Sequence, residues 1–188
     1  MIFHFGHMFM DQGAGGRFDP IPWTMKDFKQ VFKTWDDAFK EKGWGSVFLG
    51  NHDFPRMVSR WGNDRDYWEK SSKLLFTLLL TMRGTTFIFQ GDEIGMTNTR
   101  LSAVSESKDI ETQNGWREAQ KKAITEKDFL KAANYAGRDN ARTPMQWSDE
   151  PNGGFSQGKP WMNLNENTSD FNVEAEQHDS HSILNYFR

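Results

Sequence analysis

The sequence predicts an α/β fold in which parallel strands are joined by helices. Three short apolar runs have the length and composition of buried strands, at residues 2–6, 46–50 and 85–89. Two longer segments lie between them, one beginning after Thr24 and one spanning residues 67–82, and both are apolar enough to pack as helices. Strands that alternate with helices in this order favour parallel pairing through helical crossovers.

The first helix is predicted from its cap and from one apolar face. Thr24 has the residue type of an N-cap, and Asp27 three positions later makes a weak capping box. The apolar residues recur at spacings of three and four, as Met25, Phe28, Val31, Phe32, Trp35 and Phe39. Gly43 ends the helix, and the Gly- and Asp-rich residues 11–22 before it are expected to form a loop.

The second helix, over residues 67–82, is apolar on most sides, so we expect it to be deeply packed. A loop ending near Asp66 connects it to the strand at 46–50. Gly84 separates the helix from the strand at 85–89 because glycine is a poor helix former.

Polar side chains follow two of the strands directly. Residues 51–53 (NHD) come after one strand, and residues 90–93 (QGDE) come after the next. In parallel α/β folds the functional groups lie where strands end and loops begin. For each residue of the 51–53 cluster taken alone, a structural role is the better interpretation. We expect a structural role for Asp92 and Glu93 as well. The cluster at 51–53 has no further histidine or carboxylate at metal-ligand spacing, so no metal site is predicted.

The remainder of the chain is less regular. Helices are expected near 109–122 and 126–136, the second of them capped by Thr125 and closed by Gly137. Residues 138–177 are rich in Asn, Gly, Pro and Trp and are expected to form a long ordered loop. The tryptophans of this loop could serve as platforms for sugar rings, but loop packing is the favoured interpretation.

Composition excludes several classes of partner. The chain has 188 residues, 26% of them charged, and a formal net charge of -3 without a basic stripe, so nucleic acid is not an expected partner. The longest apolar stretch, at residues 74–80, is too short to span a bilayer, so no membrane partner is expected. Cysteine is absent, which excludes disulfides and fits cytoplasm or periplasm, with cytoplasm favoured.

Three long motifs resemble those of the α-amylase-type glycoside hydrolases, family 13. Residues 48–56 (FLGNHDFPR) resemble the family's strand-seven signature, and residues 84–98 (GTTFIFQGDEIGMTN) its strand-eight signature. Residues 137–147 (GRDNARTPMQW) resemble the α-glucosidase branch, which includes the oligo-1,6-glucosidases. The resemblance implies that residues 1–188 form one partial catalytic domain. Its expected fold is the C-terminal part of a TIM (β/α)8 barrel, from about strand six to helix eight, with a long loop region after strand eight.

The resemblance also implies a set of site residues. The family cleaves glycosides with retention, through a nucleophilic carboxylate and a carboxylic acid, while a third carboxylate favours the distorted transition state. Asp53 matches that third, catalytic-site carboxylate, and His52 would donate to a hydroxyl of the same sugar. Arg138 matches an arginine at the non-reducing end of that sugar. Glu111 and Arg17 would line the next subsite, Arg17 by the less secure match. Arg142 could be a second arginine that contacts the substrate, or it could hold the long loop in place, and the two interpretations are equally good.

The nucleophile and the general acid belong to strands four and five of the family, and no stretch before Asn51 carries either motif. The apolar start at residues 2–6 and the amphipathic end at 182–188 predict a chain cut through structure. We therefore expect part of an exo-acting α-glucosidase for short α-1,6 or α-1,4 oligosaccharides, inactive alone. The alternative is a standalone sugar-binding or vestigial module. No cofactor is expected, since the calcium site of relatives would lie in the absent part, as would an acidic partner for Arg138.

Overall fold

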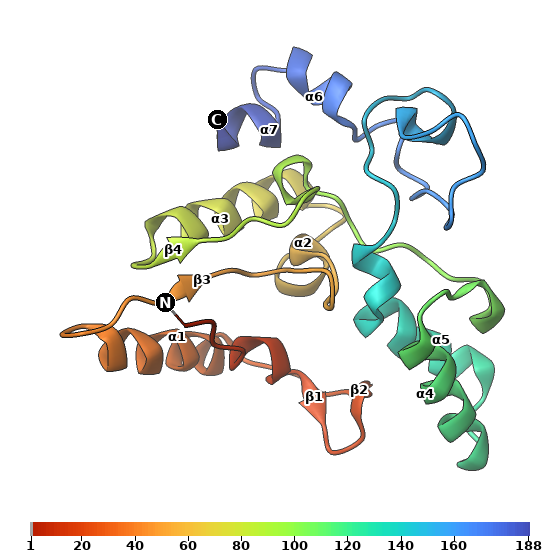
Figure 1. Ribbon diagram of the computed structural model, residues 1–188, viewed down its shortest axis with the longest axis horizontal. Coiled ribbons are helices and arrows are strands. Elements are labelled where there is room, and N and C mark those ends of the chain that lie inside the picture. The colour runs from red at the N-terminus through yellow and green to blue at the C-terminus, as the bar shows by residue number, and fades with distance from the viewer. Residues whose placement is uncertain (1) are drawn as a thin grey trace.

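The computed structural model describes residues 2–188 (Figure 1). The helices are α1 (Met25–Phe39), α2 (Met57–Trp61), α3 (Trp68–Thr81), α4 (Ile110–Lys121), α5 (Glu126–Ala136), α6 (Val173–His178) and α7 (Ile183–Phe187). The strands are β1 (Gln12–Gly13), β2 (Gly16–Pro20), β3 (Ser46–Val47) and β4 (Thr85–Thr86). Short 3-10 turns lie at η1 (His7–Phe9), η2 (Asp92–Ile94), η3 (Val104–Glu106), η4 (Arg138–Ala141) and η5 (Pro151–Gly154).

The predicted parallel pairing is confirmed between β3 and β4, where Ser46 pairs with Thr85 and Val47 with Thr86. The strands are shorter than predicted, with two residues each. The strand expected at residues 2–6 is wrong: Ile2 makes one parallel bridge to Gly45, and the chain then turns into η1. A ladder extends only where a neighbouring strand supplies hydrogen bonds, and the described residues give this segment a partner at a single position.

The first helix begins where its cap predicted. The hydroxyl of Thr24 accepts a hydrogen bond from the Asp27 amide at 3.2 Å. The predicted apolar face is only partly buried, because Phe28 lies in the core whereas Met25 is 54% exposed. The helix ends at Phe39, and the Gly43 amide then bonds back to the Phe39 carbonyl.

The second predicted helix is α3, and its bounds agree with the prediction within one residue at each end. Leu75, Phe76 and Leu79 are buried in the main core, but Leu74 on the same helix is 68% exposed. The expectation of burial on most sides is therefore wrong. In Figure 1, α3 runs beside β4 and α2, and α7 lies against another of its sides.

The β1–β2 hairpin and helix α2 were not predicted. The segment at residues 11–22 holds an antiparallel hairpin of β1 and β2, and the expected loop before Asp66 contains α2. Helix α2 has five residues, too few for a helical period to stand out. Its buried residues Met57, Val58 and Trp61 join Phe48 in the main core, directly under the segment that follows β3.

Helices α4 and α5 are confirmed and pack against each other as a pair (Figure 1). Thr125 caps α5 by accepting from the Asp128 amide, and Gly137 follows its last residue. The predicted long loop contains η4, η5 and most of α6. It is ordered in part by the ring of Phe171, which stacks on Trp68 with centroids 3.8 Å apart. Within residues 2–188, no helix is long and apolar enough to cross a bilayer.

Candidate active site

Asp53 is positioned by the buried segment that follows β3. Phe48 and Leu49 anchor this segment in the core, and the side-chain oxygen of Asn51 accepts a hydrogen bond from the Asp53 amide at 2.8 Å. The next residue, Phe54, is buried and holds the following turn down. The Asp53 carboxylate itself remains 42% accessible. The chain thus presents a carboxylate at a strand end while its neighbours on both sides are fixed.

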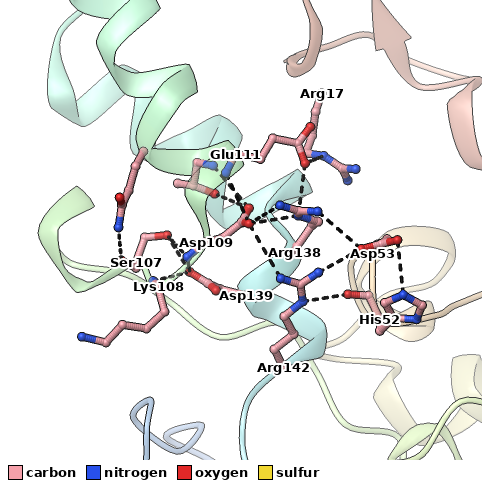
Figure 2. Close-up of polar contacts among 12 residues, drawn as sticks. Arg17, His52, Asp53, Ser107, Lys108, Asp109, Glu111, Arg138, Asp139 and Arg142 are labelled. Atoms are coloured by element: carbon pink, nitrogen blue, oxygen red, sulfur yellow. Dashed lines mark hydrogen bonds and ion pairs between the residues drawn. The ribbon is translucent and has the colours of Figure 1, made fainter.

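Three cationic or donor groups surround this carboxylate (Figure 2). Arg142 Nη2 lies 2.9 Å from Asp53 Oδ1, and Arg138 Nη1 lies 3.6 Å from the same oxygen. His52 Nε2 lies 3.3 Å from Oδ2. Arg142 also donates from Nε to the His52 carbonyl at 2.9 Å. The nearest contacts of both arginines are therefore with Oδ1 of Asp53, and the nearest contact of the histidine is with Oδ2.

Arg138 is presented by η4, immediately after α5. Its Nε donates to Asp109 Oδ1 at 3.0 Å and lies 3.2 Å from Glu111 Oε2. The hydrogen bond to Asp109 raises the pKa of Arg138. Burial opposes ionisation of Asp109, but the hydrogen bond and charge of Arg138 hold the pKa of this carboxyl below its ordinary value.

Arg17 reaches the site from β2, although the match of its loop to the family was the less secure one. Its Nε lies 3.0 Å from Glu111 Oε2, and its Nη1 donates to the Ala136 carbonyl at 3.2 Å. The guanidinium also lies over the Phe54 ring, 4.9 Å from its centroid. Glu111 is thereby shared between Arg17 and Arg138. The structure thus brings together all six site residues that the sequence singled out.

Arg138 has an acidic partner within this chain that the sequence did not predict. That partner is Asp109, the N-cap of α4, with 1% of its side chain exposed. The partner expected in the absent part of the barrel stays a prediction. Asp109 Oδ2 accepts from the Thr112 amide and hydroxyl, so no oxygen is free for chemistry. The available signal was the N-cap position of Asp109 at the start of the helix expected near 109–122. Asp139 fixes the backbone just before Asp109, because its carboxylate accepts a hydrogen bond from the Lys108 amide at 3.0 Å.

Two further residues that the sequence offered as possible site residues are Asp92 and Trp161. Asp92 is buried, and burial raises its pKa to about 7 in spite of the nearby charge of Arg56. Its Oδ2 accepts from the Phe89 amide, which is a structural contact. Trp161 is 51% exposed rather than packed, and its Nε1 donates to the Arg142 carbonyl at 2.8 Å.

The arrangement suits recognition of neutral hydroxyl groups. A carboxylate and a guanidinium both bind paired hydroxyls, and here the two types alternate across one surface. The accessible carboxylates are Asp53 and Glu111, and the arginines beside them are Arg17, Arg138 and Arg142, whereas Asp109 is buried and fully hydrogen-bonded. Among residues 2–188, no group of three or more His, Cys, Asp or Glu could hold a metal ion.

Comparison with known proteins decides the family. The family described as "Alpha amylase, catalytic domain" matches residues 1–188. The chain belongs to this family. It is 43% identical over 189 residues to the oligo-1,6-glucosidase of Parageobacillus thermoglucosidasius, covering 100% of this chain and 34% of that protein. It is 42% identical over 188 residues to the oligo-1,6-glucosidase of Halalkalibacterium halodurans, again covering 100% and 34%.

Solved structures give the same assignment at the level of fold. Isomaltulose synthase from Klebsiella sp. LX3 aligns with a TM-score of 0.94 and 40% identity, covering 98% of this chain and 34% of that one. The alpha-amylase-family chain is therefore a partial (β/α)8 barrel, as the motifs implied. It spans about a third of the length of the curated relatives it matches.

Proposed function

We propose that this chain supplies the substrate-binding and transition-state-stabilising side of a retaining, exo-acting α-glucosidase. The substrates are α-1,6- or α-1,4-linked glucosides in short oligosaccharides. The observation that carries the proposal is the geometry of Asp53, whose Oδ1 is held by Arg142 at 2.9 Å while its Oδ2 lies 3.3 Å from His52 Nε2. Such a carboxylate is oriented but keeps an acceptor for a sugar hydroxyl.

The residues around Asp53 bind different parts of the substrate. Asp53 and His52 bind hydroxyls of the sugar whose bond is broken, and hydrogen bonds that strengthen as the ring flattens count toward turnover. Arg138 closes the pocket at the non-reducing end, which makes the enzyme exo-acting. Glu111 and Arg17 lie beyond Arg138 and line the place of the next sugar, joined to each other at 3.0 Å.

The bond-breaking groups come from outside the described residues. Retaining hydrolysis needs a nucleophile and an acid about 5 Å apart, flanking the glycosidic bond. In this cluster Asp109 is fully hydrogen-bonded and Glu111 is paired with two arginines. Residues 1–188 alone are therefore expected to hydrolyse no glycoside. The oligo-1,6-glucosidases named above support the substrate class, since they match the whole chain.

The test is a fusion of this chain to the preceding portion of the Parageobacillus thermoglucosidasius oligo-1,6-glucosidase. Isomaltose and maltose are each supplied, and the first anomer released is followed by proton NMR. The expected result is hydrolysis with the α-anomer appearing first. A fusion with a cooperative melting transition that cleaves neither sugar, or that releases the β-anomer first, would overturn the proposal.

A second candidate is a sugar-binding module without catalysis. Trp161 favours it, because this half-exposed ring donates to the Arg142 carbonyl and offers an aromatic face on which a sugar ring could stack. The test is saturation-transfer NMR of the unfused chain with methyl α-D-glucoside, comparing wild type with Trp161→Leu. Transfer that is lost in the variant supports the module, and no transfer to folded wild type excludes it.

A further inference from the structure

Asp109 contacts both arginines that flank the catalytic-site carboxylate. Arg138 donates to its Oδ1 from Nε at 3.0 Å and also from Nη2, and Arg142 Nη1 lies 3.7 Å from the same oxygen. On their other side the two guanidinium groups meet Asp53 (Figure 2). Two cations therefore lie between two carboxylates, one buried and one accessible.

The buried carboxylate is fixed more firmly than the accessible one. Asp109 accepts from the Glu111 and Thr112 amides at the start of α4, so it does not follow a moving arginine. Asp53 Oδ2 has His52 as its partner and is otherwise open. If the negative charge of Asp109 were lost, Arg138 would gain most by closing its 3.6 Å gap to Asp53. A second guanidinium bound to Oδ1 would then turn the Asp53 carboxylate and move Oδ2 away from the position where it accepts from the sugar.

We propose that Asp109 is a positioning residue that holds Arg138 and Arg142 at a working distance from Asp53. This inference rests on the proposed function of Asp53. The charge of Asp109 keeps both arginines pointing into the site without saturating the Asp53 carboxylate. All four groups lie within this chain, so the arginine clamp, Arg138 and Arg142 between Asp109 and Asp53, is built from residues of this chain alone.

The capping role of Asp109 can be separated from its charge. Asparagine caps a helix about as well as aspartate, so Asp109→Asn keeps the start of α4 and removes the charge. Asp109→Ala removes both. Thr125→Ala is the matched control, because Thr125 caps the neighbouring helix α5 by accepting from the Asp128 amide. Among the described residues, its side chain has no hydrogen bond with Arg138 or Arg142.

In the fusion described above, Asp109→Asn is expected to lower kcat for isomaltose by about 10²-fold, with KM changed less than about threefold. Asp109→Ala shows the same loss of kcat and a lower Tm as well. Thr125→Ala lowers Tm by about 2–4 °C and leaves kcat unchanged. Wild-type kcat in Asp109→Asn, or an equal loss of kcat in Thr125→Ala, would overturn the inference.

A second measurement does not depend on activity. In the unfused chain labelled with nitrogen-15, the Nε–H signals of Arg138 and Arg142 are expected to shift in Asp109→Asn, while that of the buried Arg56 stays in place. If the unsubstituted fusion is inactive, the proposed function fails, and these signals alone decide whether the clamp exists. Unmoved signals for both arginines in a folded variant would refute it.

Discussion

Asp53 is suited to its proposed role because its two oxygens have different surroundings. Arg142 and Arg138 both approach Oδ1, whereas Oδ2 meets His52 at 3.3 Å. The arginines orient the group, and the second oxygen accepts from the sugar. A carboxylate of this kind stabilises charge that develops in the transition state, and it forms no covalent bond.

Replacing Asp53 by Asn should therefore affect turnover more than binding. In the fusion, Asp53→Asn is expected to lower kcat on isomaltose by about 10²–10³-fold, with a small change in KM. Steady-state kinetics measure both constants. Asp37→Asn serves as the control, since Asp37 is an exposed residue of α1 paired only with Lys33. A kcat for Asp53→Asn equal to that of Asp37→Asn would contradict the role.

Glu176 gives the fold a pH dependence of its own. Burial raises its pKa to about 7 from 4.5, although the Leu184 amide donates to Oε2 at 2.9 Å, and Oε1 is buried without a partner among the described residues. Between these two pKa values the folded chain keeps a proton that the unfolded chain has lost. The free energy of unfolding therefore falls as pH rises across this window.

The variant Glu176→Gln should remove that penalty. Its Tm is expected to exceed that of wild type near about pH 8 and to match it near about pH 4, because only above the unfolded-state pKa does the wild type carry the cost of burying charge. Thermal melts over this pH range measure the difference. Glu174→Gln, an exposed change on the same helix, should track wild type throughout. A parallel offset at every pH for Glu176→Gln would show that its effect is not titration.

At this scale the sequence predicted which residues lie close together wherever a motif carried the residue, and their roles stay predictions. His52, Asp53 and Arg138 lie inside the long motifs, and the structure brings them together. Asp109 was missed because its contact with Arg138 joins positions 29 apart, which no local pattern reveals. The exposure of Trp161 was likewise beyond a sequence argument, since it depends on what covers the loop.

Among the elements, a buried ion pair joins three segments under the site. Arg60 of α2 donates to Asp11, just before β1, from Nε at 2.9 Å, and the hydroxyl of Tyr135 on α5 donates to the same carboxylate at 2.8 Å. Both members of the ion pair are almost fully buried. The Arg60 guanidinium also lies over the ring of Phe54, the residue that follows Asp53, 5.1 Å from its centroid. The pair thus supports the turn that presents the catalytic-site carboxylate.

Breaking this pair from one side should be costly. Asp11→Asn leaves the Arg60 charge buried with a weaker partner, and the expected loss is about 3–5 kcal/mol in the free energy of unfolding. Urea denaturation followed by tryptophan fluorescence measures it. Asp37→Asn, which alters an exposed pair, should leave the urea midpoint unchanged. Equal midpoints for the two variants would show that the buried pair does not join the segments.

The starts of the helices with caps were predicted within one residue, whereas α1 ends at Phe39, several residues before the predicted end at Gly43. Helices α1, α4 and α5 each begin after a Thr or Asp whose side chain accepts an amide hydrogen bond. Helix α2 and the β1–β2 hairpin were missed because five residues or fewer carry no clear period. The strands were overestimated because apolar composition predicts burial, whereas strand length depends on pairing partners far along the chain.

For the whole molecule, the apolar surface beside the strands is the main departure from an ordinary domain. Phe3, Phe5 and Phe9 are exposed, and Phe87 and Ile88 continue the patch after β4. The ring of Phe3 lies 4.7 Å from that of Phe87, so the two ends of the patch are in contact. In a (β/α)8 barrel, residues beside the strands are covered by neighbouring strands and helices. The patch is thus placed where the rest of such a barrel would pack, and an uncovered patch of this kind favours aggregation.

The central claim is that this chain provides one side of a catalytic site and that another polypeptide segment provides the bond-breaking groups. The most direct measurement compares isomaltose hydrolysis by the 188-residue chain alone, by the separately produced preceding portion of the Parageobacillus thermoglucosidasius enzyme, and by an equimolar mixture of the two. The account predicts hydrolysis by the mixture only. Hydrolysis by the 188-residue chain alone at the rate of the mixture would contradict it.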